Sequence, residues 1–500
     1  MSSSYQRFSS GVVYLVGAGP GDPGLLTLRG RDLLSSADCV IYDYLADLSL
    51  LKYVPSDAEI IDVGKRPDRP MPQDEINEII LACAKRHERV VRLKGGDPML
   101  FGRGGEEAMA LVEHKIRFEV VPGVSSAIAV PAYAGIPVTH RGVSNTLTIV
   151  TGHRQGGGEG EMDFEALVRL GGTIVVLMGV AHRKAIAQGL IDAGMASNTP
   201  AASIQWGTKA AQKSWRGTVG ELGEAPISSP STIVIGAVAS FNLVFFESRP
   251  LFGKKIVITR APRQTGLLEG QLRLLGAEVV VAPSIDIAPP LDNYDSLDRE
   301  ISRIETYEYL IFTSVNAVEA FFSRIDDIRR LARLKLVAIG TSTQKAIESF
   351  QLRVDLVPRE AHQEALLKEF PIDKGRVLYP RAEIVRDLLI GGLIELGHEV
   401  VDPIAYRNVD YDPSEIEIDA ILGCDGICFT SSSSVVNFLK IYSKDRLPRS
   451  VFSIGPITTK TARDCGIEVS ATADLHNLDG LVETLVAFFA DDFPSVDRIG

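Results

Sequence analysis

Three segments in the first third of the chain are rich in glycine and contain arginine or acidic residues. Their sequences are VGAGPGDPGLLTL (16–28), RLKGGDPMLFGRGGEE (92–107) and VPGVSSAIAVPAYAGIPVTHRG (121–142). Glycines let the backbone approach a ligand closely. Arg103 and Glu106 stand three residues apart at the start of an expected helix, so they face the same way. This combination predicts loops that approach a ligand closely; a capped helix start with solvated charges is the structural alternative.

The first segment partly matches the glycine fingerprint of dinucleotide-binding folds. Gly17 and Gly19 fit that fingerprint, but its third glycine position holds Asp22. An acidic side chain there would repel a pyrophosphate at a helix N-terminus. Asp43, at the end of the next expected strand, keeps a dehydrogenase as a minor alternative. A tight turn without any ligand is a second alternative.

Strands and helices alternate along the first half of the chain. Strands are expected at 12–19, 39–43, 118–123, 146–153, 173–179 and 232–240 and within 89–98, and a helix at 73–86. Such alternation predicts a parallel sheet, where ligands bind beyond the carboxyl ends of the strands. The composition changes near Thr139. We therefore expect two α/β domains, 11–138 and 139–246, followed by a linker at 247–254.

The part of the chain after the linker contains an internal repeat. IVITRAP (256) is matched by RVLYPRAE (376), IFTSVNAVEAFF (311) by CFTSSSSVVNFL (428), and AIGTSTQKA (338) by SIGPITTKTA (453). Three blocks in the same order indicate a duplication, at about 255–375 and 376–500. It predicts two similar α/β domains facing each other across a cleft. The FTS and IG blocks open helices, whose free N–H groups suit carboxylates or phosphates.

Composition limits the class of protein. Of 500 residues, 45% are apolar and 23% charged, as in soluble globular chains. The net charge of −12 disfavours a nucleic-acid binder. No apolar run reaches the ~20 residues of a membrane helix, and residues 1–10 lack a signal-peptide core. The five cysteines show no zinc-type spacing. We expect a cytoplasmic enzyme with no metal and with no membrane or nucleic-acid partner.

The motifs together resemble one family. GAGPGDPGLLTL, YDYL, VGKR, KGGDPMLFGRGGEE, VPGVSSA and GIPVTHRG are similar to uroporphyrinogen-III C-methyltransferase of the tetrapyrrole methylase superfamily, over residues 11–246. The repeat and its FTS and IGPITTKTA blocks resemble uroporphyrinogen-III synthase, over 255–500. The resemblance implies an α/β architecture, with a two-domain tetrapyrrole methylase fold followed by a duplicated pair of flavodoxin-like α/β domains.

The resemblance also implies a cofactor, S-adenosyl-L-methionine, held between the two methylase domains. The matching cofactor-binding positions are Pro20, Gly95, Gly96, Asp97, Leu100, Ser125, Ser126, Met178 and Gly207. Many family members have Thr-Ala at the Ser125–Ser126 position and Phe at the Met99 position. The serine hydroxyl preserves the contact, and the methionine changes packing rather than chemistry.

Five further residues match functional positions of the methylase family. Asp43 and Lys65 match a proton acceptor and a proton donor, whereas Arg103, Glu106 and Arg141 match positions that hold the tetrapyrrole. Uroporphyrinogen is a polycarboxylate, and arginine binds carboxylates bidentately. The structural alternatives are a strand-end turn former for Asp43 and a solvated surface lysine for Lys65.

In the second half, the resemblance implies closure of hydroxymethylbilane, a linear tetrapyrrole, with inversion of ring D and without metal or organic cofactor. Tyr406 matches a tyrosine associated with departure of the hydroxyl; a half-buried linker tyrosine is the alternative. The residues expected to bind the substrate carboxylates are Thr313, Ser314, Thr430, Ser431 and Thr458.

The combined expectation is a bifunctional enzyme that forms uroporphyrinogen III and then methylates it twice to precorrin-2, on the sirohaem and cobalamin branch. Its partners would be small-molecule tetrapyrroles, and it would form a homodimer through the methylase half. Two alternatives keep the fold. One is a methylase for a later corrinoid precursor, and the other treats the duplicated half as a sensor of a small anion.

Overall fold

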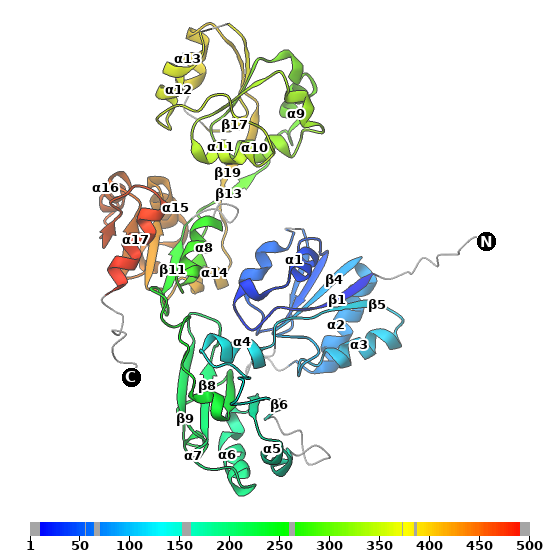
Figure 1. Ribbon diagram of the computed structural model, residues 1–500. Helices are drawn as coiled ribbons and strands as arrows, with labels where there is room; N and C mark the ends of the chain where they lie inside the picture. Colours follow the sequence, from blue (N-terminus) through cyan, green and yellow to red (C-terminus); the bar gives the residue numbers. More distant parts are fainter. Residues whose placement is uncertain are drawn as a thin grey trace, which may run out of the picture. The chain divides into compact units, whose positions relative to one another are not determined.

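The computed structural model describes residues 11–55, 57–64, 71–152, 162–259, 266–372, 374–384 and 388–490 (Figure 1). The chain separates into two compact units. The first contains residues 1–256, 268–279 and 485–500, and the second contains 257–267 and 280–484. Lys65 lies outside the described residues, so the structure does not place this predicted proton donor.

The first sheet is parallel throughout, with the strand order β3-β2-β4-β1-β5. Its strands are β1 (Val12–Gly17), β2 (Cys39–Tyr42), β3 (Glu59–Asp62), β4 (Arg89–Lys94) and β5 (Arg117–Val121). The four strands expected from the sequence are confirmed; β3 was not predicted, because EIID is short and half exposed. Both faces of the sheet are covered, which explains the continuous apolar runs of β1 and β2.

Helices cover the two faces of this sheet. They are α1 (Leu28–Leu34), α2 (Gln73–Arg86) and α3 (Gly104–Glu113), whereas α4 (Ser126–Tyr133) packs through Ala127 and Val130 against the second sheet described below. The predicted helix at 73–86 is confirmed at both ends. Ile76, Ile80 and Leu111 of α2 and α3 pack with Val13 and Leu15 of β1 in one core. On the other face, α1 packs against the alternate residues of the same strands, and Figure 1 shows α1 and α2 on opposite sides of β1 and β4.

The second sheet is mixed and has the order β6-β7-β10-β8-β9. Its strands are β6 (Leu147–Thr151), β7 (Thr173–Leu177), β8 (Pro200–Gln205), β9 (Lys213–Thr218) and β10 (Ser231–Ile235). Strands β6, β7 and β10 were predicted, whereas β8 and β9 were missed because small and polar residues interrupt them. The helices of this region are α5 (Phe164–Leu170), α6 (Arg183–Asp192) and α7 (Val219–Leu222).

Beyond residue 254, two further sheets share one strand pattern. One has the order β12-β11-β20-β21-β22 and the other the order β18-β16-β14-β15. The strands of the first are β11 (Lys255–Ile258), β12 (Glu278–Val281), β20 (Gly426–Phe429), β21 (Ser450–Ser453) and β22 (Ala471–Thr472). Those of the second are β14 (Tyr309–Phe312), β15 (Lys335–Ala338), β16 (Arg376–Leu378) and β18 (Glu399–Val401).

Each of these sheets takes strands from both copies of the sequence repeat. The first repeat block, in β11 and β12, joins the second and third blocks of the other copy in β20 and β21. The same exchange joins β16 and β18 to β14 and β15. Figure 1 shows this as green β11 next to orange chain from the C-terminal part. The duplication thus gives two similar α/β layers, but neither layer is a continuous stretch of 255–375 or 376–500.

A small third sheet lies where the chain passes between these two layers. β13 (Ile285–Ala288) runs antiparallel to β19 (Ile404–Asp410), which also pairs with β17 (Arg381–Ala382). β13 follows the first copy of the Glu-Val-Val sequence and β19 follows the second. The chain therefore leaves one layer along β13 and returns along β19, which produces the exchange of blocks.

Ten helices accompany the sheets beyond residue 254 in the described part of the chain. They are α8 (Gly266–Leu274), α9 (Asp295–Ser302), α10 (Val315–Phe322), α11 (Thr341–Glu348), α12 (Gln363–Glu369), α13 (Leu388–Glu395), α14 (Glu415–Ala420), α15 (Ser432–Tyr442), α16 (Pro456–Asp464) and α17 (Leu478–Phe489). None of the helices in the described ranges has the length and apolar character needed to cross a bilayer.

Candidate functional site

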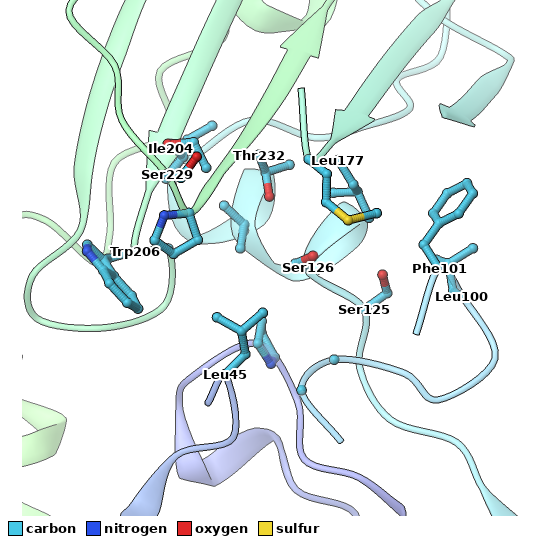
Figure 2. Close-up of a pocket in the computed structure, with 18 of the residues that line it drawn as sticks. Leu45, Leu100, Phe101, Ser125, Ser126, Leu177, Ile204, Trp206, Ser229 and Thr232 are labelled. Atoms are coloured by element: carbon cyan, nitrogen blue, oxygen red, sulfur yellow. The ribbon is translucent and has the colours of Figure 1, made fainter. Parts of the chain in front are cut away.

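A cavity of about 350 Å³ lies in the first unit. The loops that follow β1, β4, β7 and β8 enclose it, together with the start of α4 and the segment before β10. Several of these loops follow the carboxyl ends of strands, where ligands bind in parallel sheets. Figure 2 shows Leu45 on one side of the cavity and Ile204 and Thr232 on the opposite side, with Trp206 and Phe101 at its ends.

All nine positions expected to bind the cofactor line this cavity. They are Pro20, Gly95, Gly96, Asp97, Leu100, Ser125, Ser126, Met178 and Gly207. These residues come from five separate loops, so their gathering depends on the fold and not on sequence proximity. Their role toward a cofactor stays a prediction, but their common location agrees with it.

The cavity floor is held by a direct contact between two glycine loops. The Gly96 N–H donates to the Gly19 carbonyl at 2.7 Å, and the Gly19 N–H donates back to Gly96 at 3.2 Å. Both residues have positive φ, +78° at Gly19 and +67° at Gly96. A side chain at either position would be strained in this conformation. The glycines therefore set the shape of the loop edge that faces a ligand.

Asp97 fixes the cavity loop that follows β4. One carboxylate oxygen accepts the Met99 N–H at 2.8 Å and the other accepts the Gly123 N–H at 3.0 Å. These charge-assisted bonds join the loops after β4 and β5. At the start of α4, the buried Ser125 hydroxyl accepts the Ala127 N–H at 3.2 Å and caps the helix.

Asp22, the residue that breaks the dinucleotide fingerprint, has a structural role in this cavity wall. One carboxylate oxygen accepts the Gly24 N–H at 2.7 Å, and the other accepts the Tyr133 hydroxyl at 2.8 Å. The Asp22 N–H donates to the Thr208 hydroxyl at 3.0 Å. The Asp22 carboxylate therefore ties its own loop to the end of α4 where a pyrophosphate-binding fold would need glycine, which argues against the dehydrogenase alternative.

Backbone strain is concentrated at the cavity. Phe101, Met178 and Trp206 line it with φ values of 53°, 54° and 49°, in a region that residues other than glycine rarely adopt. Strained residues of this kind cluster at functional sites. Phe101 and Trp206 were not among the predicted residues. Phe101 lies within the 92–107 motif but was not singled out, Trp206 lies outside every motif, and only the folded backbone reveals their special conformation.

Lys209 and Thr232 also line the cavity and were missed by the sequence. The Lys209 ammonium lies 3.1 Å from the Asp47 carboxylate, which caps a short helix through the Ser49 N–H. Burial alone would raise the pKa of Asp47, but Lys209 and the hydrogen bonds from Ser49 outweigh it and lower that pKa. This ion pair links the two sheets of the first unit beside the cavity.

Asp43, the predicted proton acceptor, follows β2 and lies one contact away from the cavity lining. One carboxylate oxygen accepts the Gly95 N–H at 3.1 Å, and the other lies 3.4 Å from the Arg92 guanidinium. The Asp43 side chain is 26% exposed, whereas that of Arg92 is only 3% exposed. Asp43 is therefore oriented by the protein and still reachable from outside.

Behind Asp43 lies a buried charge cluster that the sequence did not predict: Arg92, Lys94 and Glu107. One Glu107 oxygen accepts from Lys94 at 2.8 Å and from Arg92 at 3.2 Å, and a third bond of 3.3 Å comes from Gln73. The other Glu107 oxygen is buried without a hydrogen-bond partner. Because Lys94 directly precedes Gly95, the cluster joins the cavity loop to α3.

The predicted substrate residues of the first half lie on the surface. Arg103 has φ 58° and precedes α3; its guanidinium makes a bidentate ion pair with Glu106 at 2.8 and 2.5 Å. Their side chains are 41% and 52% exposed. Arg141 is exposed on the tight turn closed by His140 and Ser144. These side chains do not line the cavity, although Phe101 and Gly102, next to Arg103, do.

In the second half, the structure brings Tyr406 to the block that contains Thr313 and Ser314. The Tyr406 hydroxyl donates to the Ser314 hydroxyl at 3.0 Å, and Ser314 also caps α10. Thr313 lies 3.0 Å from the hydroxyl of Tyr379, a fully buried residue that the sequence did not single out. Burial raises the pKa of Tyr379, which keeps the phenol protonated.

The other predicted residues of this half belong to the layer that contains β20 and β21. Thr430 and Ser431 follow β20, and Ser431 caps α15 through the Ser434 N–H at 3.1 Å. Thr458 is buried in the first turn of α16. Thr430 and Ser431 are equivalent in the repeat to Thr313 and Ser314, and Thr458 is equivalent to Thr343. Among the described residues, no hydrogen bond joins the two groups.

Comparisons with known proteins place both halves. Residues 12–223 match the tetrapyrrole (corrin/porphyrin) methylases, and residues 267–483 match uroporphyrinogen-III synthase HemD. A porphyrin biosynthesis protein HemD of Ruminiclostridium josui is 38% identical over 497 residues, 95% of this chain and 98% of that protein.

Two other relatives cover the first half of the chain. A uroporphyrinogen-III C-methyltransferase of Bacillus subtilis is 41% identical over 350 residues, 68% of this chain and 71% of that protein. An S-adenosyl-L-methionine-dependent uroporphyrinogen III methyltransferase of Methanosarcina barkeri is 48% identical over 255 residues, 50% of this chain and 98% of that protein. The synthase match does not favour an anion sensor. The chain therefore belongs to the tetrapyrrole methylase family, fused in one polypeptide to a uroporphyrinogen-III synthase region.

Proposed function

We propose that this chain closes hydroxymethylbilane to uroporphyrinogen III and then methylates that product twice, giving precorrin-2 for the sirohaem and cobalamin branch. The observation that carries the proposal is the succession of both family matches on one chain. The cavity adds support, since every expected cofactor position lines it. A methylase for a later corrinoid precursor does not account for the synthase region.

The cavity fits S-adenosyl-L-methionine in size and chemistry. Its volume of about 350 Å³ lies within the range of small-molecule sites. Leu100, Met178 and Trp206 offer apolar surface, while Asp97 and the two serine hydroxyls offer polar contacts. When bound, the cofactor supplies a methyl group on a positively charged sulfur. The task of the protein is then chiefly to align that methyl with a pyrrole carbon.

Asp43 is proposed to accept the proton that the methylated pyrrole carbon loses. The Gly95 N–H and Arg92 hold its carboxylate in a fixed orientation beside the cavity loop. Partial exposure leaves it accessible to a porphyrinogen. Positioned carboxylates are suitable general bases. Lys65 is proposed as the proton donor on family resemblance alone.

Arg103, Glu106 and Arg141 are proposed to bind the substrate carboxylates. Glu106 holds the Arg103 guanidinium in a bidentate geometry, which keeps the arginine oriented before substrate arrives. Arg141 is displayed on a tight turn and exposed. An arginine that exchanges water for a carboxylate gains a directional, charge-assisted contact.

In the synthase region, Tyr406 is proposed to assist departure of the substrate hydroxyl. Its phenol already donates a hydrogen bond to the Ser314 hydroxyl at 3.0 Å, next to Thr313 and Tyr379. A substrate oxygen that replaced Ser314 would receive the same hydrogen bond. Thr430, Ser431 and Thr458, at equivalent helix starts in the other layer, are proposed to bind the propionate and acetate carboxylates.

Further expectations about the whole protein are also proposals. We infer a cytoplasmic location, no nucleic-acid or membrane partner, and a homodimer formed through the methylase half. The domain limits 11–138, 139–246, 247–254 and 255–500 are proposed as functional boundaries.

Supplying each substrate separately tests the two activities. Hydroxymethylbilane without S-adenosyl-L-methionine should yield uroporphyrinogen III, identified as the type III isomer after oxidation. Uroporphyrinogen III with S-adenosyl-L-methionine should yield a doubly methylated product by mass. Formation of only the uninverted isomer would refute the synthase assignment, and the absence of methyl transfer would refute the methylase assignment.

A further inference from the structure

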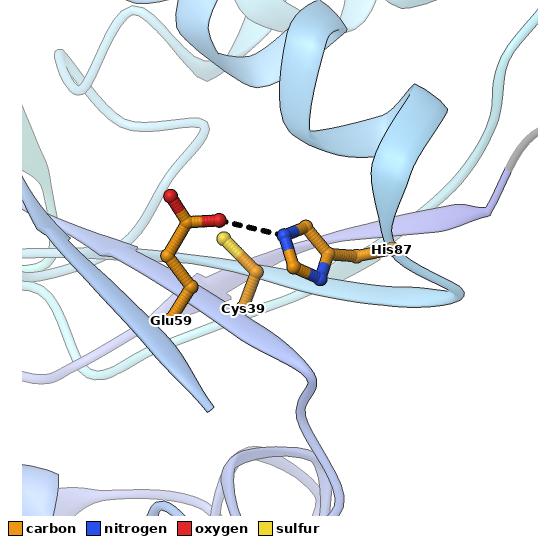
Figure 3. A group of neighbouring side chains, drawn as sticks. All are labelled: Cys39, Glu59 and His87. Carbon is orange, nitrogen blue, oxygen red and sulfur yellow. Dashed lines mark hydrogen bonds and ion pairs between the residues drawn. The ribbon is translucent and has the colours of Figure 1, made fainter. Parts of the chain in front are cut away.

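A group of metal-binding side chains gathers in the first unit, at the edge of the parallel sheet away from the cavity. The Cys39 thiol, the Glu59 carboxylate and the His87 imidazole place one ligand atom each within 4.8 Å of one another. Figure 3 shows the Cys39 sulfur directed toward the gap between the Glu59 carboxylate and the His87 ring. The composition of the chain had led us to expect no metal.

The fold explains why these side chains converge. Cys39 and Glu59 are the first residues of β2 and β3 and are direct partners in the parallel ladder. Neighbours in register point to the same face of a sheet. His87 follows α2, which covers that face, and its Nε2 atom lies 2.6 Å from a Glu59 oxygen. The site therefore joins two strands and one helix end.

A second thiol, that of Cys83, lies beside the group but is not among the three ligand atoms within 4.8 Å of one another. Cys83 lies one helical turn before His87, and the His87 N–H donates to the Cys83 carbonyl at 2.9 Å. The Cys39 and Cys83 thiols hydrogen-bond to each other, and both residues are fully buried. If the Cys83 side chain turns into the group when a metal enters, two thiols, one imidazole and one carboxylate make a donor set that zinc binds tetrahedrally.

We propose that Cys39, Cys83, Glu59 and His87 form a structural site for a zinc-type divalent metal ion. Binding would release the protons of both thiols and replace the Glu59–His87 contact with two bonds to the metal. The site would clamp β2, β3 and α2 together. It stands at the amino ends of the strands, whereas the cavity follows the carboxyl end of β4, so we assign it no part in methyl transfer.

One cation faces this group. The Arg86 guanidinium lies 3.6 Å from the Cys83 sulfur and 3.3 Å from Glu59. Its side chain is 57% exposed, so it can turn toward solvent when a metal enters. Arg86 then acts as a substitute positive charge in the metal-free protein. Arg86→Ala should therefore strengthen metal binding, a result that a merely structural ion pair would not produce.

The test uses the full chain, stripped with a chelator and reloaded with Zn²⁺. One equivalent of metal per chain is expected, with a rise in the temperature of thermal unfolding. His87→Gln should weaken the affinity about tenfold or more. Its ring is only partly buried, so this variant should keep the fold. Cys465→Ser, a thiol of the second half, is the matched control and should bind zinc as the unmodified protein does.

Loading with Co²⁺ identifies the ligands independently of stability. A tetrahedral site with two thiolates should give a sulfur-to-cobalt charge-transfer band, which Cys39→Ser should reduce and Cys465→Ser should leave unchanged. The proposal is overturned if the chain binds no metal beyond the level of the His87→Gln variant. It is also overturned if Cys39 and Cys83 instead form a disulfide in air and zinc does not protect them.

Discussion

Replacement of Glu107 should reveal most clearly how much the buried charge cluster contributes to the stability of the methylase half. The Glu107 side chain is fully buried, and it faces two cations, Arg92 and Lys94, whose side chains are 3% exposed. Glu107→Gln keeps the shape but removes the negative charge. Breaking a buried pair by removing one partner costs about 3–5 kcal/mol, because the other charge stays buried without compensation.

The measurement is hydrogen–deuterium exchange of the β4 backbone in the full chain. A loss of 3–5 kcal/mol corresponds to exchange that is faster by a factor of about 140–4,000. Glu119→Gln is the matched control, since Glu119 pairs with Arg29 on the surface, and it should leave β4 exchange unchanged. An effect of Glu107→Gln below about tenfold would refute the role assigned to the cluster.

A second substitution sharpens this prediction. Adding Lys94→Met to Glu107→Gln removes the uncompensated cation, so the double variant should exchange more slowly than Glu107→Gln alone.

The pH dependence gives a further test. Burial, followed by the charge of Arg92, lowers the pKa of Lys94, while Glu107 opposes that shift. Without Glu107 the pKa of Lys94 falls further. Stability then rises with pH up to the unfolded-state pKa, because the unfolded chain binds more protons. The deficit of Glu107→Gln should therefore shrink in alkaline buffer; a constant deficit contradicts the argument.

The remaining predictions concern both halves. Asp97→Asn should weaken S-adenosyl-L-methionine binding by roughly 10–100-fold in calorimetry, because two charge-assisted hydrogen bonds shape the cavity loop; unchanged affinity contradicts this. Arg141→Ala should raise the KM for uroporphyrinogen III and leave the unfolding temperature unchanged, since the side chain is exposed. Tyr406→Phe should slow ring closure and spare methyl transfer; equal rates would exclude a role for the phenol. Asp47 has a lowered pKa beside Lys209, so its stabilising effect should be complete above about pH 4 and lost at lower pH. Asp47→Asn should flatten that acid limb in thermal unfolding.

The sequence predicted the elements whose patterns are local. The strands of the first sheet, other than β3, and the helix at 73–86 follow from apolar runs and helical periodicity. Strands β8 and β9 were not predicted, because apolar and polar residues alternate only weakly in AASIQ and KSWRGT. Their burial depends on neighbouring strands. The exchange of repeat blocks between the two sheets was also not predicted, because sequence similarity identifies the two copies but does not show which strands pair.

The residues of the candidate site also fall into those that a local motif predicts and those that only the fold reveals. Gly95, Gly96 and Asp97 belong to a motif and were predicted, whereas Trp206 and Lys209 reach the same cavity from a segment without one. Arg92, Lys94 and Glu107 looked like ordinary members of a strand and a helix. Their importance depends on burial, which only the packing of α3 against β4 determines.

Incubation of the full chain with both hydroxymethylbilane and S-adenosyl-L-methionine tests the central claim most directly. We expect a product in which two hydrogens of uroporphyrinogen are replaced by methyl groups, so that its mass is larger by two CH₂ units. It should form without any added enzyme. Under oxygen-free conditions, little uroporphyrinogen III should accumulate. If the reaction yields only the uninverted uroporphyrinogen isomer, or type III product without added methyl groups, the chain does not carry out both steps and the account is wrong.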